Sequence, residues 1–301
     1  MNEKVISYDL GTGGIKASLF NRNGEALHSV FIPYPTAYPQ PGWQEQAPED
    51  WQAIIRSTRH LLDKTKIDKN EITALAISGH SLSVVPIGKD GSLLQVATPI
   101  WSDRRASSEA ETFFNRIDYK EWYETTGNGF PPECYSVFKI MWYKKHFPEQ
   151  YEVTDKIIGT KDYCNYRFTG RLCTDYSYAS GSGVFDLKTW NYKEEYVQAS
   201  GIRPDIFPEI LDSDAIVGTI TPEASLETGL PEHVRVICGG VDNSCMALGS
   251  KGIKPSRIYT SLGSSAWIAL VSKNPVLDFD KKPYVFAHVI KGMYASATCI
   301  F

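Results

Sequence analysis

The stretch Asp9–Lys16, "DLGTGGIK", decides the fold, because it places three glycines and one carboxylate between two short apolar runs. The run before it contains "VIS" and the run after it is "ASLF", so the pattern predicts two strands joined by a tight turn. Glycine adopts positive φ without steric cost and lets a ligand approach the backbone closely. The stretch therefore predicts either a cradle for a phosphate group or an ordinary hairpin, and both alternatives stay open here.

A second stretch, "SLGSSAWIALV" from Ser261, repeats this pattern near the other end of the sequence. Leu10-Gly11-Thr12 corresponds to Leu262-Gly263-Ser264, and each turn leads into an apolar strand. Strand and helix signals alternate after an initial meander, which is typical of an α/β fold. We expect two related domains that face one another, so that the two turns hold a phosphate chain from opposite sides. The sequence ends inside a predicted strand, and we expect the second domain to be incomplete.

Between these stretches the patterns are less regular. A mainly helical region is predicted from about Ala106 to Phe147, and irregular Gly- and Tyr-rich sequence from Gly159 to Gly183.

Length and composition exclude several classes of function. A chain of 301 residues would ordinarily form about two domains, and a net charge of -4 provides no field that attracts nucleic acid or anionic membranes. No apolar run approaches the ~20 residues needed to span a bilayer, and the start "MNEKVISYDL" lacks the pattern of a signal peptide. The six cysteines form no CxxC pair. We expect a reduced, cytoplasmic protein with no nucleic-acid or membrane partner.

Any phosphate binding must use an uncommon design, because GxxxxGK[ST] is absent and "GTGGIK" lacks the last glycine of GxGxxG. Backbone N–H groups and the Thr12 hydroxyl at a glycine turn can hold phosphate oxygens. The Asp9 carboxylate would repel phosphate unless a metal lies between them, and it suits a Mg²⁺ position. The alternative is that Asp9 is a turn residue that bonds its own backbone.

The segment "GGVDNS", Gly239–Ser244, lies between the predicted strand "VRVIC" and a helix expected to open at about Asn243. Ligands commonly bind beyond the carboxyl end of such a strand. Asp242 would stand there near a helix N-terminus, which favours its ionised form. An ionised aspartate can accept the proton of a hydroxyl that attacks phosphorus. The alternative is a simple N-cap role for Asp242.

The segments "SGHSLS" and "PIWSDRRA" bring His80, Trp101, Asp103 and Arg104 to the ends of apolar strands. This set suits a polyhydroxylated ligand, since Asp and His pair with hydroxyls while Trp covers a C–H face. The alternative is a core Trp101 and an Arg104 that pairs with Asp103 or Glu109 on the surface.

"GHSLS" also nearly spells G-x-S-x-G, the nucleophile turn of α/β-hydrolases, with Ser81 as the nucleophile. Ser83 stands where the last glycine of that motif belongs, which weakens the hydrolase hypothesis.

In this order the constellations resemble the FGGY family of carbohydrate kinases, within the actin, Hsp70 and sugar-kinase superfamily. "YDLGTGGIKASLFN" is similar to the first phosphate motif of the family, and "SLGSSAW" to the second. "PGWQEQAPEDWQ", "SVFKIMWYKKHFPE" with Lys139 and Trp142, "GTKDYCNYRFTG" and "CGGVDNSCMALG" are similar to further segments of the family. The similarity runs from Tyr8 to the end of the chain, and the ordered set is more specific than any single motif.

The resemblance implies a ribonuclease H-like fold of duplicated domains, with a sugar-binding domain over residues 1–247 and the beginning of a nucleotide-binding domain over 248–301. It implies ATP-dependent phosphorylation of a sugar hydroxyl with Mg²⁺. Xylulokinases are the most similar subfamily, on "WSDRR", "KDY" and "GGVDN", which implies a ketopentose such as D-xylulose. The resemblance is compatible with a homodimer.

The resemblance also assigns residues. Asp242 is implied as the general base, and Asp9 together with Asp242 as the Mg²⁺ ligands. The implied phosphate-binding residues are Gly11, Thr12, Gly13, Lys16, Gly263, Ser264 and Ser265. The implied sugar-binding residues are His80, Trp101, Asp103, Arg104 and Asn243.

Other functions stay open. Gly79-His80-Ser81 stands where xylulokinases usually have Met-His-Gly, so another ketose or a polyol is an alternative substrate. A non-catalytic sugar-binding fragment and an ATP-driven binding protein resembling chaperones or actin filaments are alternatives to a kinase. A hydrolase that uses Ser81 is the alternative with different chemistry.

Overall fold

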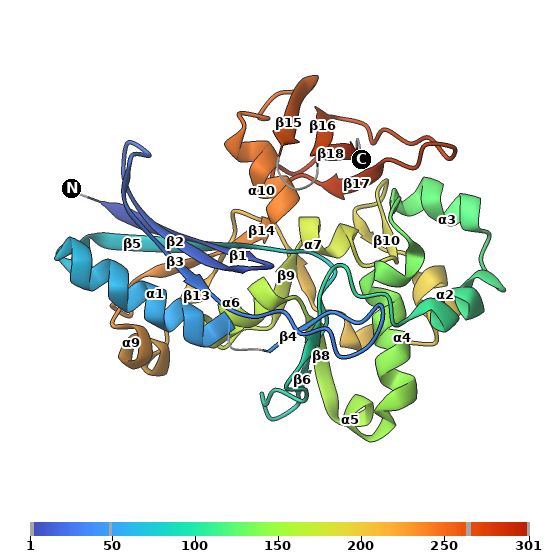
Figure 1. Cartoon of the computed structure of the whole chain (residues 1–301), viewed down its shortest axis with the longest axis horizontal. Helices are drawn as coiled ribbons and strands as arrows, with labels where there is room; N and C mark the ends of the chain where they lie inside the picture. Colours follow the sequence, from blue (N-terminus) through green and yellow to red (C-terminus); the bar gives the residue numbers. More distant parts are fainter. Residues whose placement is uncertain (1–2, 48–49, 263–265, 300–301) are drawn as a thin grey trace.

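The computed structural model describes residues 3–47, 50–262 and 266–299, and its two largest β-sheets, with helices between and around them, form the frame of the fold (Figure 1). Four further sheets among the described residues have two strands each. The larger sheet has six strands in the order β13-β14-β5-β1-β2-β3. These are β1 (Lys4–Gly11), β2 (Gly14–Asn21), β3 (Ala26–Pro33), β5 (Ile72–Gly79), β13 (Ile216–Thr219) and β14 (Arg235–Val241). The first three strands form an antiparallel meander, while β1, β5 and β14 run parallel to one another. The predicted α/β class is therefore confirmed.

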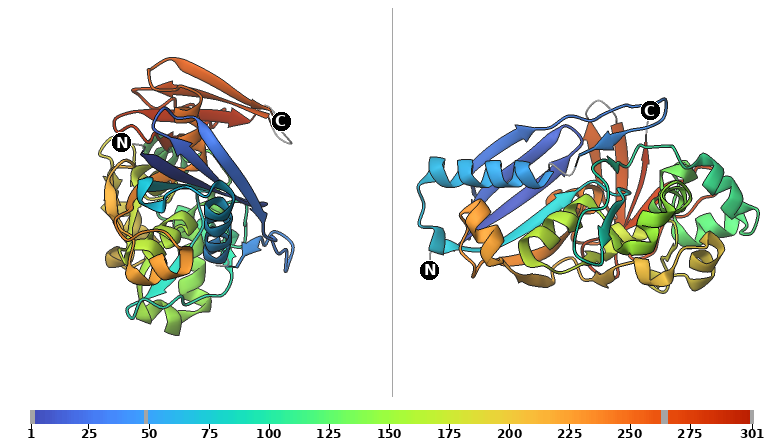
Figure 2. Two further views of the ribbon diagram at one scale, coloured as in Figure 1. Left: turned by 90° about the vertical axis from the view of Figure 1, so that its left-hand side faces the viewer. Right: turned by 90° about the horizontal axis from the view of Figure 1, so that it is seen from below.

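Alternation along β1 sets the two faces of this sheet. Ile6, Tyr8 and Leu10 are buried on one face, and Asp9 is exposed on the other. Helices α1 (Asp50–Thr65), α6 (Thr160–Thr169) and α9 (Pro222–Thr228) cover the buried face. The smaller sheet lies on the side of the larger one away from α1 (Figure 2). Asp9 therefore points toward the part of the molecule that contains the smaller sheet.

The smaller sheet has four antiparallel strands in the order β15-β16-β18-β17. They are β15 (Arg257–Leu262), β16 (Ala266–Ser272), β17 (Tyr284–Ala287) and β18 (Tyr294–Cys299). Helix α10 (Asp242–Gly249) packs against β14 and β5 of one sheet and against β17 and β18 of the other. The hairpins β1–β2 and β15–β16 arise from the two stretches that repeat each other in sequence. The division at residues 247 and 248 stays a prediction.

A helical region with an aromatic core lies beside both sheets. It contains α2 (Ser107–Phe114), α3 (Tyr119–Thr126), α4 (Ser136–His146), α5 (Pro148–Val153) and α8 (Glu194–Ser200). Phe113 packs edge-on against Phe138 at 5.3 Å between ring centroids, and Trp122 and Tyr196 are fully buried in the same cluster. The predicted helical middle is thus confirmed as three separate helices, α2, α3 and α4.

Short elements complete the chain. They are β4 (Glu45–Gln46), β6 (Val85–Gly88), β7 (Thr98–Pro99), β8 (Thr154–Ile158), β9 (Cys173–Asp175), α7 (Tyr176–Ser180), β10 (Phe185–Asp186), β11 (Asn191–Tyr192), β12 (Glu209–Leu211) and the 3₁₀ turns Lys69–Glu71, Pro132–Cys134 and Pro204–Ile206. The prediction of irregular sequence over 159–183 is wrong, because α6 and α7 lie within that range.

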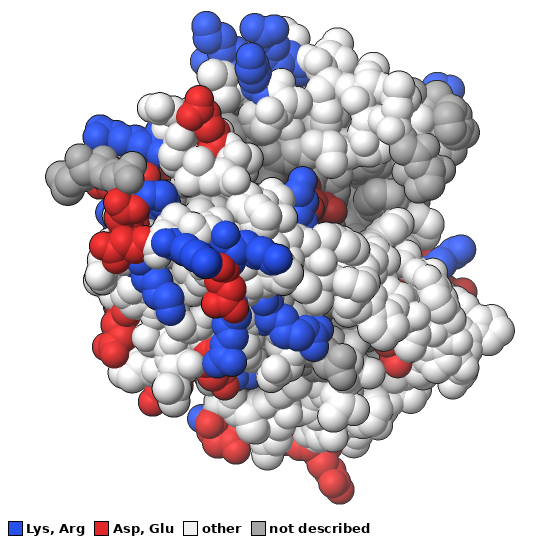
Figure 3. Space-filling model, turned by 60° about the vertical axis from the view of Figure 1, so that its left-hand side comes forward, with Lys and Arg blue, Asp and Glu red and all other residues white. Residues whose placement is uncertain are grey.

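Surface charge, the cysteines and the lengths of the helices bear on the classes of function considered above. Lysine, arginine and acidic side chains are interspersed on the face that Figure 3 shows. The five cysteines whose side chains the structure describes are free, and four of them are buried. Within the described ranges, no helix combines the length and apolar character that crossing a membrane requires.

Candidate active site

The turn between β1 and β2 carries Thr12, and side chains from the segment after β3 hold that turn in place. Tyr34 donates its hydroxyl to Gly11 O at 2.7 Å, and Thr36 donates to Thr12 O at 3.1 Å. Gln46 Nε2 also donates to Thr12 O, at 2.7 Å. The backbone of the turn is therefore fixed from one side, while the Thr12 side chain stays exposed.

One glycine of the turn is sterically required. Gly14 has φ of +152°, and a Cβ there would lie 2.5 Å from Ile32 O on β3. Gly13 is different, since a Cβ at that position would meet no atom within 4 Å. Packing of the hairpin therefore explains why residue 14 is glycine. It gives no steric reason for a glycine at position 13. The predicted phosphate contacts of Gly11, Thr12 and Gly13 stay predictions.

Asp9 and Lys16 face each other across the hairpin, because they are partners in the register of β1 and β2. Asp9 lines a cavity of about 870 Å³ between the sheet and α10, together with Ser78 and Cys245. Desolvation raises the pKa of the Asp9 carboxyl, while a hydrogen bond with Ser78 and the charge of Lys16 act in the opposite direction. The acidic side chain of Asp9 and the basic side chain of Lys16 therefore belong to neighbouring strand positions close to the turn.

The parallel strands bring Asp242 to the same edge of the sheet. Leu10 pairs with Gly79, and Gly79 pairs with Val241, so β1, β5 and β14 end side by side. Asp242 follows directly as the first residue of α10. The helix therefore opens one residue earlier than predicted, and Val241 occupies the N-cap position. The N-cap alternative for Asp242 is wrong as stated, although its Oδ1 accepts a bond from Asn243 N at 2.7 Å.

The protonation of Asp242 is tuned by its surroundings. Burial raises the pKa of this carboxyl to about 7, and the negative charge of Asp9 acts in the same direction. The hydrogen bond from Asn243 N opposes this rise. A carboxylate with a pKa near 7 can both accept and release a proton at neutral pH, which suits a general base.

His80 lies at the end of β5 and is almost completely buried. Its Nε2 is 3.1 Å from Gln46 Oε1, so the same glutamine contacts both the hairpin turn and the imidazole. Burial lowers the pKa of His80 to about 4, and the charge of Lys139 adds to this effect. The imidazole is therefore neutral at physiological pH.

Lys139 on α4 joins the loop after His80 to the loop that carries Trp101. Its buried ammonium donates to Leu82 O at 3.0 Å and to Ile100 O at 2.6 Å. Burial lowers the pKa of this lysine to about 8. Lys139, the lysine of the K-x-x-W segment, therefore links the loop that contains Leu82 to the loop that contains Ile100.

Trp101 is not part of the core, because 40% of its surface is exposed. Its indole Nε1 donates to Thr12 Oγ1 at 3.2 Å. The indole is therefore held beside the hairpin turn, with part of its ring exposed to solvent. The alternative of a core tryptophan is wrong, and its sugar contact stays a prediction.

Asp103 is fully buried, and protein groups already bond its carboxylate. Its Oδ2 accepts from Gln44 N at 2.6 Å and from Arg105 Nη2 at 2.7 Å. Arg104 turns away and pairs with Glu133 at 2.6 Å. The alternative pairing of Arg104 with Asp103 or Glu109 is therefore wrong, because Arg105 takes the place beside Asp103. Sugar contacts of Asp103 and Arg104 stay predictions.

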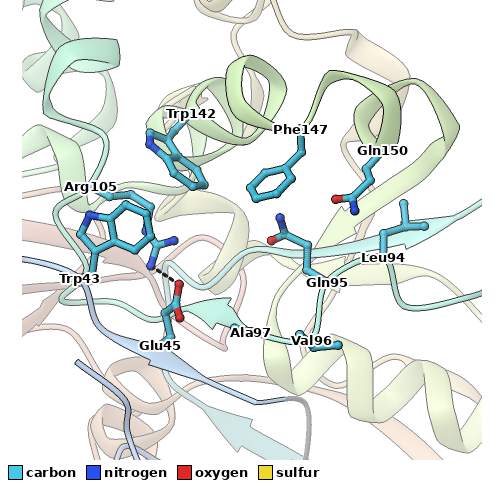
Figure 4. A pocket seen from close by; sticks show the side chains of 10 residues that line it. All are labelled: Trp43, Glu45, Leu94, Gln95, Val96, Ala97, Arg105, Trp142, Phe147 and Gln150. Atoms are coloured by element: carbon cyan, nitrogen blue, oxygen red, sulfur yellow. Dashed lines mark hydrogen bonds and ion pairs between the residues drawn. The ribbon is translucent and has the colours of Figure 1, made fainter. Parts of the chain in front are cut away.

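Arg105 lies between two tryptophans at a pocket of about 370 Å³ (Figure 4). Its guanidinium is 3.9 Å from the Trp43 ring centroid and 4.9 Å from that of Trp142, and it pairs with Glu45 at 2.7 Å. Glu45 and Gln46 are neighbours on β4, so their side chains point to opposite faces. One short strand thus connects this stacked cluster to His80.

The remaining predicted residues divide into two groups. Asn243 is half-buried on α10, and its carbonyl accepts a bond from the Tyr259 hydroxyl at 3.2 Å. Gly263, Ser264 and Ser265, the predicted second phosphate motif, lie outside the described residues. Ser81 is buried, and the neighbouring His80 is bonded to Gln46 through Nε2, so the described contacts do not prepare Ser81 as a nucleophile.

The donor set at this edge of the sheet fits a Mg²⁺ ion. Asp9 and Asp242 are close enough for the charge of Asp9 to raise the pKa of Asp242. Carboxylate oxygens are the hard ligands that Mg²⁺ prefers, and a cation would relieve the repulsion between Asp9 and Asp242.

Sequence reasoning missed Gln46, Gln44 and Arg105. All three are charged or amide side chains within "WQEQ" and "SDRR", where alternation could have assigned Glu45 and Gln46 to opposite faces. Each of them, however, has a partner far away in the chain: Gln44 bonds Asp103, Gln46 bonds His80 and Arg105 bonds Glu45, at separations of 59, 34 and 60 residues. Only the folded structure brings these groups together.

The chain is similar in sequence and in fold to several sugar kinases. The chain is 29% identical over 287 residues to the xylulose kinase of Staphylococcus xylosus and 30% identical over 291 residues to that of Bacillus subtilis (strain 168), covering 95% and 96% of this chain. It spans 59% and 58% of the length of these relatives. The crystal structure of gluconate kinase from Lactobacillus acidophilus superposes with a TM-score of 0.90 at 26% identity, over 99% of this chain and 60% of that one.

The superposition confirms the predicted fold of the actin, Hsp70 and sugar-kinase superfamily. Residues 4–249 match the family described as "FGGY family of carbohydrate kinases, N-terminal domain". Since this match covers most of the chain and includes the hairpin turn, His80, Trp101 and Asp242, the chain belongs to the FGGY family of carbohydrate kinases.

Proposed function

We propose that the protein phosphorylates a hydroxyl group of a sugar with ATP as the phosphate donor. The observation that carries the proposal is Asp242, whose pKa is raised to about 7 where β14 ends beside the β1–β2 hairpin. A base of this kind is matched to a sugar hydroxyl that attacks phosphorus at neutral pH. Family membership and the xylulose and gluconate kinases among the similar proteins support a sugar as the acceptor.

In the proposed reaction, the sugar hydroxyl oxygen forms a bond to the γ-phosphorus of ATP while the bond from that phosphorus to the β,γ-bridging oxygen breaks. Asp242 takes the hydroxyl proton, and ADP leaves. Lys16 and the Thr12 hydroxyl approach the phosphate oxygens, where the positive charge of Lys16 offsets developing negative charge. Gly11, Gly13, Gly263, Ser264 and Ser265 are proposed to contribute the remaining phosphate contacts.

Asp9 and Asp242 would hold Mg²⁺, which neutralises charge on the phosphates when it is bound. The base and metal roles of Asp242 compete for the same carboxylate, so Asp9 is the proposed principal ligand.

The proposed sugar site extends from His80 to Trp101 and Asn243. Trp101 offers an exposed ring to a C–H face, and Asn243 lies next to the base on α10. Asp103 and Arg104 belong to this site in the proposal, with Asp103 acting by holding Arg105 and Gln44 rather than through a free carboxylate. A ketopentose such as D-xylulose is the proposed substrate, in a cytoplasmic protein whose described cysteines are reduced.

The test is sugar-dependent ADP release by the full-length protein across a panel of D-xylulose, other ketoses, polyols and gluconate. Stimulation by D-xylulose well above the other compounds would support the proposal as stated. Stimulation by gluconate or a polyol alone would keep the kinase and replace the substrate. No stimulation by any compound, from a folded protein that binds ATP, would contradict a sugar kinase.

A further inference from the structure

The first turn of α10 makes two contacts to which the proposed chemistry gives no role. Asn243 O accepts a hydrogen bond from the hydroxyl of Tyr259 on β15, at 3.2 Å. The fully buried Ser244 donates its hydroxyl to Ala287 O at the end of β17, at 2.8 Å. Both of these strands belong to the smaller sheet. The two residues that follow Asp242 are therefore tied to a different sheet from the one whose strand β14 leads into Asp242.

Tyr259 can hold this turn because its own ring is fixed. The ring packs edge-on against Trp267 of β16, with 5.4 Å between the ring centroids. It also packs against the two buried clusters that contain Val241, just before α10, and Ala247, within α10. Burial and the negative charge of Asp242 raise the pKa of the Tyr259 hydroxyl. The hydroxyl therefore keeps the hydrogen that a carbonyl acceptor requires.

The residue before Asp242 is held from the other direction. Val241 N donates to the hydroxyl oxygen of Ser177 on α7, at 2.9 Å. The backbone is thus held by Ser177 before Asp242, and by the hydroxyls of Tyr259 and Ser244 after it. These hydrogen bonds fix the Cα of the proposed base without using its carboxylate.

The strand that carries Tyr259 also leads toward the phosphates of the proposed reaction. β15 ends at Leu262, directly before Gly263, the first residue of the second predicted phosphate motif. Misplacing a reacting group by about 1 Å can slow a reaction roughly a hundredfold. We propose that Tyr259 and Ser244 are positioning residues for phosphoryl transfer, because their hydroxyls fasten the turn that carries Asp242 to the sheet that leads into this motif. This deepens the proposed function and rests on it.

Steady-state kinetics of Tyr259→Phe and Ser244→Ala in the full-length protein test this role, with D-xylulose or whichever sugar of the panel above the parent phosphorylates. Each variant should lower kcat roughly tenfold or more, because the base is no longer held in place. The KM for the sugar and its calorimetric affinity should change little, since neither hydroxyl is proposed to touch the sugar. A folded variant with the kcat of the parent would overturn the role of that residue and leave the kinase standing. A parent that releases no ADP with any sugar would overturn both proposals.

Two further proteins separate this role from general loosening of the smaller sheet. Tyr294→Phe is the matched control, because the Tyr294 hydroxyl on β18 also donates to a backbone carbonyl, that of Leu187, which lies outside α10. This control should keep the kcat of the parent, and a loss equal to that of Tyr259→Phe would overturn the specific role. Replacing Tyr259 with 4-aminophenylalanine keeps a hydrogen-bond donor and should restore most of kcat. The same loss as in Tyr259→Phe would overturn the hydrogen bond as the cause.

Hydrogen–deuterium exchange tests the two ties without any substrate. In a helix the carbonyl of Asn243 accepts from the amide four residues later, so loosening the first turn exposes amides along α10. Peptides that cover residues 242–249 should exchange faster in Tyr259→Phe and Ser244→Ala than in the parent, and at the rate of the parent in Tyr294→Phe. Exchange at the rate of the parent in both Tyr259→Phe and Ser244→Ala would overturn the proposal, whatever the kinetics show.

Discussion

Asp242 owes its raised pKa to its position between two sheets. It follows β14 directly, is half-buried at the start of α10, and lies near the negative charge of Asp9. The amide of Asn243 and the helix N-terminus stabilise the ionised form, but burial outweighs them, because the pKa is raised to about 7. A carboxylate that is costly to ionise in the folded protein binds a proton more tightly, which suits a general base. The same cost lowers the stability of the folded protein at a pH where the carboxylate is ionised.

This cost makes a prediction for stability without any substrate. The folded pKa of Asp242 is about 7 and the ordinary value is 3.8, so between these values the unfolded state has lost its proton while the folded state keeps it. Stability therefore falls as pH rises through this window. Asp242→Asn, which cannot ionise, should raise the melting temperature at pH 8 and change it little at pH 4.

Thermal unfolding of both proteins at several pH values checks this expectation, with exposed Asp214→Asn as the control that shows no such pH-dependent gain. Equal melting curves for the parent and Asp242→Asn at pH 8 would show that Asp242 is not held in a desolvated position.

For single residues, the sequence predicts which side chains belong to the candidate site better than it predicts which residues they contact. Asp9, His80 and Asp242 were predicted as site residues from local motifs, and the structure places them at the ends of adjacent strands. Gln46 could not be predicted, because its contacts with Thr12 and His80 depend on segments 34 residues away. For Asp103 the residue was predicted but its partner was not. The sequence suggested a pair with Arg104, whereas the structure shows a hydrogen bond from Arg105.

The backbone of strand β14 approaches that of β5 very closely just before Asp242. Its register to β5 is irregular between Ile237 and Gly240. Gly239 within this irregularity has φ of +73°, and a Cβ there would lie 2.0 Å from Ile77 O. Backbone in β5 cannot yield as a flexible side chain can. Glycine is therefore required here by contact as well as by conformation.

Gly239→Ala should lower the free energy of unfolding by more than about 3 kcal/mol, since it adds a backbone clash to an unfavourable φ. Gly24→Ala is the matched control: Gly24 has φ of +79°, but a Cβ there would meet no atom within 4 Å. It should cost only about 1 kcal/mol, from backbone conformation alone. Urea unfolding of the two variants measures the difference, and equal losses would contradict a close approach at Gly239.

A buried polar network connects α6, β9 and α7 to the same strand. Lys161 pairs with Asp162 and, at 3.0 Å, with Asp175, and all three side chains are fully buried. Asp175 accepts from the Ser177 hydroxyl, whose oxygen accepts from Val241 N at 2.9 Å. The residue next to Val241 is Asp242. The network therefore fixes the backbone that carries the proposed base.

Removing the cation of this network should be costly, because the carboxylates of Asp162 and Asp175 would keep their hydrogen bonds but stay buried without the charge of Lys161 to balance them. Lys161→Met should lower the free energy of unfolding by about 3–5 kcal/mol. Lys120→Met, which removes an exposed pair with Glu124 on α3, should cost only about 0.3–0.5 kcal/mol. Chemical denaturation decides the matter, and a loss below about 1 kcal/mol for Lys161→Met would mean that the network carries little of the fold.

The region that holds this network is also where prediction from sequence failed. Its glycines and tyrosines suggested irregular structure, but Gly159 and Gly170 are the caps of α6, with Gly170 in the left-handed conformation at φ of +74°. Seven of the ten residues of α6 are buried, and they include polar and charged side chains, so α6 has no amphipathic pattern to reveal it. Strands β1, β2 and β14, by contrast, were predicted correctly from their apolar runs and turn glycines.

In the whole molecule, two sheets that each begin with a similar hairpin are joined through β14 and α10. Sequence alone predicted a repeated strand–turn–strand unit from Leu10-Gly11-Thr12 and Leu262-Gly263-Ser264. Both β1–β2 and β15–β16 are antiparallel pairs, while Gly263 and Ser264 lie outside the described residues. The substrate could not be predicted at the same level. The proposed sugar site draws on side chains from several elements that meet only in three dimensions, and the relatives named above are only 29–30% identical to this chain.

The most direct test of the proposed chemistry compares the full-length protein with its Asp242→Asn variant, by sugar-dependent ADP release and by calorimetric binding of the same sugar. The account predicts that the variant binds the sugar with similar affinity but releases ADP roughly 10²–10⁴-fold more slowly, the contribution of a general base. A folded variant that keeps its sugar-dependent activity would contradict Asp242 as the base and, with it, the proposed mechanism.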